Sequence, residues 1–299
     1  MIAPSFDSLV VLGPTASGKT RLGVALARIF AGEIISADSR QVFRGMDLGT
    51  GKDLVEYNDI PYHLIDLQPP GTEFSVYEFL QAATKALTVI RSRQRLPVVV
   101  GGTGLYLDAL LKGYRMVPAP VDPVLRSKLA EYSLEELQSE LCRLRPRQHN
   151  RTDLDDRERL LRAIEIAVAE ARETGPSPPQ LQPVIFGLHW PREVLRQRIR
   201  IRLAERLEQG LLEEVSGLVA AGVSYATLDY YGLEYRFIAR FLRGELKRSE
   251  LETQLAIAIG QFAKRQETWF RRMERQGTPI QWLDAASDPL AAALKVLGQ

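Results

Sequence analysis

Residues 9–20 constrain this chain more than any other stretch, because they combine a strand, a glycine-rich loop and the start of a helix. The apolar run Leu9–Leu12 is short and β-branched at its centre, which predicts a buried parallel strand. The next residues fill the pattern G-x-x-x-x-G-K-[ST] at Gly13, Gly18, Lys19 and Thr20. In such a loop, backbone N–H groups and a helix N-terminus cradle phosphate. The sequence therefore predicts a protein that binds a di- or triphosphate.

This glycine-rich loop supplies the predicted phosphate ligands. They are Gly13, Thr15, Ala16, Ser17, Gly18, Lys19 and Thr20. We expect Lys19 to neutralise phosphate charge and the Thr20 hydroxyl to help hold Mg²⁺. Mg²⁺ is the cofactor that the chemistry implies, although no complete set of metal ligands is visible in the sequence.

The composition narrows the class of protein further. A chain of 299 residues, 45% hydrophobic and 25% charged, has room for one large domain with an insertion, or for two domains. Its net charge of +2 does not by itself indicate a nucleic-acid partner. The single cysteine excludes an internal disulfide and a cysteine-based zinc site, and it suits a reducing compartment. With no signal peptide or membrane-spanning run visible, we expect a cytoplasmic protein without a membrane partner.

The order of apolar segments predicts an α/β protein, namely a phosphate-loop parallel sheet flanked by helices, with an inserted all-helical domain. Further strands are expected at 33–37, 62–66, 97–100 and 184–188, and long helices at 74–91 and 191–209. Between them lies a strand-free region, 115–182, in which Ser133 and Glu136 have the spacing of a capping box. Its end, 174–183, has the composition of a linker. The core would then comprise 1–114 and 183–299.

Polar residues follow the predicted strands. In parallel sheets ligands bind beyond the carboxyl ends of strands, so Asp38 should face the phosphate site, either as a catalyst or as a helix cap or magnesium partner. The segment 40–52 is expected to be a surface loop that handles a ligand. Gly101–Gly104 follows another strand and would let backbone approach that ligand. His63 is expected to be a buried or capping histidine rather than a catalyst.

Arginines are concentrated in the predicted helix 191–209. Arg198, Arg202 and Arg206 form one stripe on it, and Lys264 and Arg265 add charge later in the chain. Such stripes are often solvated faces, but arginine also suits bidentate phosphate contacts, so a track that binds a polyanion is equally well supported. Together with the phosphate loop, these residues fit either a small-molecule kinase or a transferase with a diphosphate leaving group.

Five motifs then decide between these classes. They are Gly13–Thr20, Asp38–Thr50, Gly101–Tyr106, Arg162–Ile166 and Phe262–Phe270. The residues of these motifs and their order along the chain resemble those of the tRNA dimethylallyltransferases over nearly the whole chain. The resemblance implies that the phosphate loop holds the diphosphate of dimethylallyl diphosphate rather than ATP. It also implies transfer of the dimethylallyl group to N6 of the adenosine on the 3′ side of the anticodon of tRNA, with release of diphosphate.

The resemblance also assigns roles to residues. Asp38 resembles the carboxylate that accepts the proton of the adenine amine, Thr103 resembles a threonine beside the reacting atoms, and Thr20 would complete the catalytic set. The predicted contacts to the anticodon arm, including those suggested by charge alone, are Asp38, Ser39, Arg40, Gln41, Val42, Phe43, Arg159, Arg162, Arg198, Arg202, Lys264 and Arg265. We expect a monomer with tRNA and dimethylallyl diphosphate as partners. Dimethylallyl transfer to AMP, ADP or ATP, a phosphate-loop kinase and an RNA-binding protein with a degenerate site remain alternatives.

Three positions depart from the pattern of that family. Gly49-Thr-Gly-Lys-Asp53 stands where much of the family reads Gly-Thr-Ala-Lys-Pro. Tyr231-Gly-Leu-Glu-Tyr235 lacks the usual Lys or Arg, and Ile259-Gly260 stands where Thr-Arg is common. Two cationic positions are therefore missing, which is expected to weaken anion contacts unless nearby arginines compensate.

Overall fold

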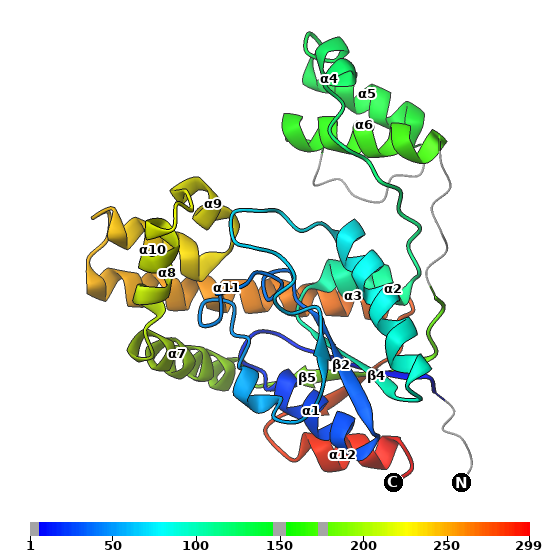
Figure 1. Cartoon of the computed structure of the whole chain (residues 1–299), viewed down its shortest axis with the longest axis vertical. Coiled ribbons are helices and arrows are strands. Elements are labelled where there is room, and N and C mark those ends of the chain that lie inside the picture. The colour runs from blue at the N-terminus through cyan, green and yellow to red at the C-terminus, as the bar shows by residue number, and fades with distance from the viewer. Residues whose placement is uncertain (1–5, 146–153, 173–178) are drawn as a thin grey trace. The chain divides into compact units, whose positions relative to one another are not determined.

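The computed structural model describes residues 6–145, 154–172 and 179–299 (Figure 1). It divides into two compact units. One comprises Met1–Lys112 together with Gln180–Gln299, and the other is Gly113–Pro179. Residues 174–178 of the predicted linker lie outside the described residues. Sequence reasoning had set the corresponding boundaries at 115 and 182.

The larger unit is built on one sheet of six parallel strands. Its strands are β1 (Ser8–Leu12), β2 (Gly32–Ala37), β3 (Tyr62–His63), β4 (Leu96–Gly101), β5 (Pro183–His189) and β6 (Ile280–Asp284). Their order in the sheet is β3-β2-β4-β1-β5-β6, with every pair parallel. The strand order reverses at β1, and a parallel sheet binds ligands beyond the carboxyl ends of strands at such a point.

Helices cover both faces of this sheet. The helices of this unit are α1 (Lys19–Ile29), α2 (Val76–Ser92), α3 (Gly104–Leu111), α7 (Arg192–Glu208), α8 (Leu211–Ala220), α9 (Tyr225–Tyr230), α10 (Leu233–Leu242), α11 (Arg248–Arg275) and α12 (Pro289–Val296). Of these, α7 to α10 pack on one another and on α11 beside the sheet. Figure 1 shows α1 and α12 below the sheet, α3 and α11 above it, and α2 to the right of β2 and β4. A short 3₁₀ helix, Leu54–Glu56, follows the segment 40–52. The alternation of buried strands and amphipathic helices that the sequence predicted is thus present.

The smaller unit consists of the helices α4 (Pro123–Lys128), α5 (Leu134–Leu144) and α6 (Arg157–Arg172). Leucines of α5 and α6 form its core, with Leu137, Leu141 and Leu160 fully buried. Ser133 and Glu136 form the predicted capping box at the start of α5. The predicted fold class, a parallel α/β sheet flanked by helices with an inserted helical region, is confirmed. In the described parts of the chain, no helix combines the length and apolar character needed to cross a bilayer.

The predicted strand 62–66 is wrong in length, because β3 contains only two residues. Leu64 and Asp66 have φ angles of 65° and 57°, and this left-handed backbone cannot continue a strand. His63 does have the structural role expected of it, since its Nε2 lies 2.7 Å from Oε2 of the buried Glu33.

Candidate active site

The phosphate loop joins β1 to α1 and is held in place from α7. Trp190 donates its indole N–H to the carbonyl of Ser17 at 2.9 Å, and Nε of Arg198 donates to the carbonyl of Ala16 at 2.9 Å. The Arg198 guanidinium also lies 4.4 Å from the centre of the Trp190 ring. Gly18 has a φ of 86°, which a glycine adopts without strain. These contacts fix the carbonyls of Ala16 and Ser17 and so hold the loop in shape.

A second contact joins the loop to the neighbouring strand β4. Gln266 on α11 accepts a hydrogen bond from the Thr15 N–H at 2.9 Å and donates one to the Gly102 carbonyl at 2.9 Å. A Cβ on Gly102 would lie 2.5 Å from Nε2 of Gln266, so the glycine makes room for this bridge. Sequence reasoning missed Gln266. The signal was a polar residue at helical spacing among the buried positions of α11, between Ala263 and Phe270.

A cavity of about 570 Å³ opens where β1, β2 and β4 end. It is lined by the phosphate loop and by the predicted catalytic residues Thr20, Asp38 and Thr103. Oδ1 of Asp38 accepts the Arg40 N–H at 2.9 Å, and Oγ1 of Thr103 accepts the Ser39 N–H at 3.0 Å. The threonine therefore ties the turn after β2 to the end of β4. The structure brings together all three residues that the sequence assigned to catalysis.

The electrostatics of this cavity are dominated by buried cations. Enclosure of the Lys19 ammonium lowers its pKa to about 8, an effect that Arg202 and Arg206 reinforce and Asp38 and Asp53 oppose. A cation that has lost hydration gains more from a bound anion than one in water. The cavity is therefore suited to a ligand with several negative charges.

Two arginines of α7 share one carboxylate in this cavity. Asp53 accepts a hydrogen bond from Nη2 of Arg202, and its Oδ1 lies 3.7 Å from Nη2 of Arg206. Arg206 is 9% exposed, and its Nη2 has no hydrogen-bond partner among the described residues. Loss of hydration lowers the pKa of Arg206. The backbone at Gly51 passes so close that a Cβ there would collide with the Arg206 guanidinium.

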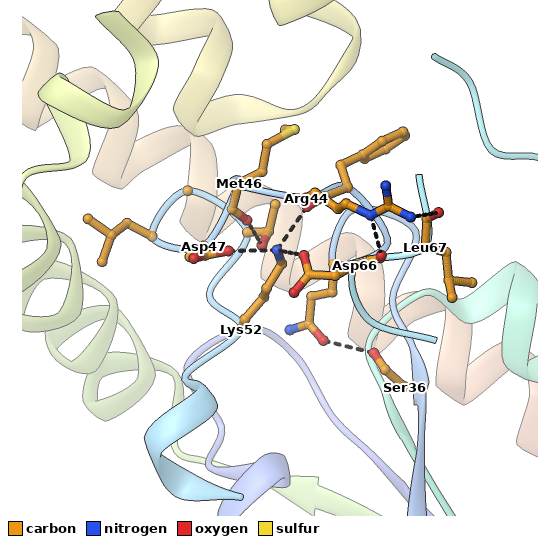
Figure 2. Close-up of polar contacts among 12 residues, drawn as sticks. Ser36, Arg44, Met46, Asp47, Lys52, Asp66 and Leu67 are labelled. Atoms are coloured by element: carbon orange, nitrogen blue, oxygen red, sulfur yellow. Dashed lines mark hydrogen bonds and ion pairs between the residues drawn. The ribbon is translucent and has the colours of Figure 1, made fainter. Parts of the chain in front are cut away.

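The segment 40–52 is largely buried, which corrects the expectation of a surface loop. Figure 2 shows the reason, because the ammonium of Lys52 lies between Asp47 and Asp66. It donates to Oδ1 of Asp47 at 2.6 Å, to the Phe43 carbonyl at 2.8 Å and to Asp66, and the Lys52 side chain is 0% exposed. Lys52 is thus a structural cation that folds the segment back on itself. Its two ends line the cavity, with Arg40 and Gln41 at the start and Gly49, Thr50 and Gly51 near the finish.

Glu214 of α8 holds the same segment from outside. Its carboxylate accepts the N–H groups of Asp47, Leu48 and Gly49 at 2.8, 2.7 and 3.0 Å, and the Tyr235 hydroxyl at 2.7 Å. Like Gln266, this residue was missed, since its backbone partners lie more than 160 residues away in the chain. Lys52 and Glu214 together fix the part of the loop that borders the cavity.

The residues predicted to contact tRNA fall into several places. Asp38, Ser39, Arg40, Gln41, Arg198 and Arg202 line the cavity. Val42 and Phe43 have fully buried side chains and anchor the segment, so only their backbone is available to a partner. Lys264 and Arg265 are exposed on α11, with Lys264 lining a separate groove between α7 and α11. Arg159 and Arg162 belong to α6 in the smaller unit, where Arg162 pairs with Glu165 at 3.1 Å.

The aromatic residues near the cavity mostly pack inside the protein. Phe270 and Tyr231 are buried, and the Tyr231 ring lies 4.5 Å from that of Phe43. Tyr230 is exposed, and the Arg40 guanidinium lies 4.5 Å from its ring centre. Core packing therefore accounts for Phe270 and Tyr231, whereas Tyr230 has an exposed ring.

Comparisons with known proteins place this geometry in context. The model of the IPP transferase family matches residues 41–273. A tRNA dimethylallyltransferase 2 from Syntrophotalea carbinolica is 61% identical over 290 residues, covering 96% of this chain and 97% of that protein. A tRNA dimethylallyltransferase 1 from Geotalea daltonii is 58% identical, covering 98% and 95%.

Solved structures of related proteins are also similar to this chain. A tRNA isopentenylpyrophosphate transferase from Bacillus halodurans superposes with a TM-score of 0.71 at 32% identity, covering 98% of this chain and 95% of that one. A eukaryotic dimethylallyltransferase acting on tRNA shares the fold with a TM-score of 0.79 at 23% identity, covering 94% and 74%.

Proposed function

The chain belongs to the IPP transferase family, and on that basis we propose that it transfers the dimethylallyl group of dimethylallyl diphosphate to tRNA. The acceptor is N6 of the adenosine on the 3′ side of the anticodon, and diphosphate is released. One observation carries the proposal: the phosphate loop, Asp38 and Thr103 line one cavity in a chain 61% identical to a tRNA dimethylallyltransferase over nearly its full length. As expected from the sequence, we also propose that the protein is cytoplasmic and monomeric.

The reaction forms a bond from N6 to the allylic carbon and breaks the bond from that carbon to the diphosphate oxygen. An adenine amine is a weak nucleophile, so Asp38, which lines the cavity, is proposed to accept its proton. The N–H groups of the phosphate loop, Lys19 and the α7 arginines stabilise the negative charge that grows on the leaving diphosphate. Thr103 keeps the turn that carries Asp38 in place through its bond to Ser39.

The cavity also fits the magnesium ion that the chemistry implies. The described residues contain no group of three or more His, Cys, Asp or Glu side chains able to hold a metal. Mg²⁺ commonly uses few protein ligands and takes its other oxygens from phosphate and water. Thr20, which lines this cavity, would hold such an ion. When bound, it supplies positive charge to the diphosphate oxygens.

Extrusion of the base is a further requirement, since an adenosine in a stacked loop cannot reach a cavity of this depth. The exposed Tyr230 with Arg40 against its ring offers a surface for the displaced nucleoside beside Asp38. The charged residues Lys264 and Arg265 remain candidates for contacts to the RNA backbone.

The test is an incubation of the purified protein with Mg²⁺ and radiolabelled dimethylallyl diphosphate, with unmodified tRNA and AMP in parallel tubes. We expect label in tRNA, and nuclease digestion would then locate it on the adenosine next to the anticodon. Label in AMP alone would make the protein an adenylate dimethylallyltransferase. Absence of label together with phosphoryl transfer from ATP would make it a kinase.

A further inference from the structure

We propose that Asp53 is an internal counter-ion that competes with diphosphate for Arg202 and Arg206. Its carboxylate hydrogen-bonds Arg202 and lies 3.7 Å from Arg206, and a bound diphosphate would take over both guanidinium groups. Asp53 would then weaken diphosphate binding and speed release of the diphosphate product. This inference rests on the proposed function, because it concerns the same cavity and the same leaving group.

The position of Asp53 carries the first step. It lines the cavity together with Lys19, Thr20 and both arginines, so its carboxylate is in the space that a diphosphate needs. It is bonded to Arg202, and this side-chain pair is only partly exposed, at 28% for Arg202 and 32% for Asp53. An arginine bonded to a carboxylate presents fewer N–H groups to a second anion.

The second step concerns Arg206. The carboxylate of Asp53 hydrogen-bonds Arg202, and Nη2 of Arg206 is left buried without a hydrogen bond among the described residues, 3.7 Å from Asp53. A buried cationic donor without an acceptor is unfavourable. A diphosphate carries more oxygens over a greater length than one carboxylate, so it can hydrogen-bond both arginines at once. Nη2 of Arg206 is therefore available to hydrogen-bond a larger anion.

The local sequence supports the same reading. Gly51 and Asp53 are the two places where the loop departs from the Gly-Thr-Ala-Lys-Pro pattern. They are also the two loop residues that meet Arg206 and Arg202. A side chain at 51 would push the Arg206 guanidinium away, and a proline at 53 would remove the carboxylate that hydrogen-bonds Arg202. The departures thus act together on one pair of cations.

The experiment measures binding of inorganic diphosphate by isothermal titration calorimetry. Asp53→Asn keeps the size of the side chain and tolerates the φ of 47° at this position, while it removes the charge. We expect its dissociation constant to fall about tenfold, equivalent to about 1.4 kcal/mol. Product inhibition of dimethylallyl transfer by diphosphate should strengthen by a similar factor. Asp53→Gly, which also suits this backbone, gives a second measurement if the first variant folds poorly.

Two controls separate direct competition from a general effect of charge. Glu205→Gln removes a carboxylate that lines the same cavity, and no ion pair of Glu205 with an arginine occurs in the described structure. We expect it to change diphosphate affinity less than twofold. In an Arg202→Ala, Arg206→Ala background, adding Asp53→Asn should also change affinity less than twofold, because the groups for which Asp53 competes are gone.

The measured diphosphate affinities either support or overturn the proposed competition. Equal or weaker diphosphate binding by Asp53→Asn would show that Asp53 orients the arginines for the ligand, and would overturn competition. If the wild type binds diphosphate but transfers no dimethylallyl group, the proposed function fails while the comparison of the two proteins still decides the role of Asp53. If neither protein binds diphosphate, both the inference and the assignment of the cavity are wrong.

Discussion

Replacement of Lys52 by methionine tests whether a buried ammonium holds the segment 40–52. Methionine keeps the length of the side chain and much of its apolar packing, so the variant removes the charge and its three hydrogen bonds. The carbonyl of the buried Phe43 would lose its 2.8 Å bond to the ammonium, which costs about 1–2 kcal/mol. The ion pairs cost less, about 0.5–1 kcal/mol each, because Asp47 is 54% and Asp66 37% exposed and water can reach them.

These terms predict that Lys52→Met lowers the free energy of unfolding by about 2–4 kcal/mol. For a chain of this size, that loss lowers the melting temperature by roughly 5–12 °C. Differential scanning fluorimetry, with urea denaturation to obtain the free energy, measures both. Diphosphate affinity should fall as well, since Gly49–Gly51 at the end of the segment line the cavity.

Lys85→Met is the matched control, because Lys85 is exposed on α2. It should leave the melting temperature within about 1 °C of wild type. If Lys52→Met melts within the same range as this control, the ammonium does not hold the segment, and the account of its burial is wrong.

Three further predictions concern the cavity. Asp38→Asn should lower turnover on the order of 10²–10⁴-fold with little change in tRNA affinity if the carboxylate accepts the proton, and an unchanged rate would make Asp38 structural. The pKa of Lys19 is lowered to about 8, so its ammonium loses its charge as the pH rises through that value. Wild type should bind diphosphate more tightly than Lys19→Met below about pH 8, and this difference in affinity should shrink above it. Titrations at several pH values would check this, and a constant ratio would contradict it. Gln266→Ala should weaken diphosphate binding about tenfold, because it removes the side chain that joins Thr15 to Gly102. Gln261→Ala is the control, since Gln261 is exposed on the same helix, and it should leave diphosphate affinity unchanged. Equal effects of the two substitutions would refute the bridge.

Local rules in the sequence predicted the phosphate loop and its flanking strand and helix, because this motif needs only neighbouring residues. They also placed Asp38 and Thr103 at one edge of the sheet, since both follow strands of a parallel sheet. The length of β3 could not be predicted in the same way. It depends on the left-handed backbone at Asp66, whose carboxylate binds a lysine fourteen residues earlier.

The residues that hold the loops around the cavity could not be predicted from the sequence, for a related reason. Glu214 and Gln266 bind backbone groups that are distant in the chain, and neither contact leaves a local pattern. The arginine stripe of α7 was recognised, but the sequence could not say what its residues face. Packing of α7 and α11 turns Arg198 and Arg202 toward the phosphate loop, which favours contacts with diphosphate beside the predicted contacts with tRNA.

The hydrogen bond from Trp190 to the phosphate loop has an optical consequence. The chain contains three tryptophans, and Trp190 is the one bonded to the Ser17 carbonyl with a guanidinium against its ring. Indole emission responds to nearby charge and to its hydrogen bond, so rearrangement of the loop around an anion would change the light that Trp190 emits. A protein in which Trp269 and Trp282 are replaced by phenylalanine would then report occupancy of the phosphate loop in real time, without a label.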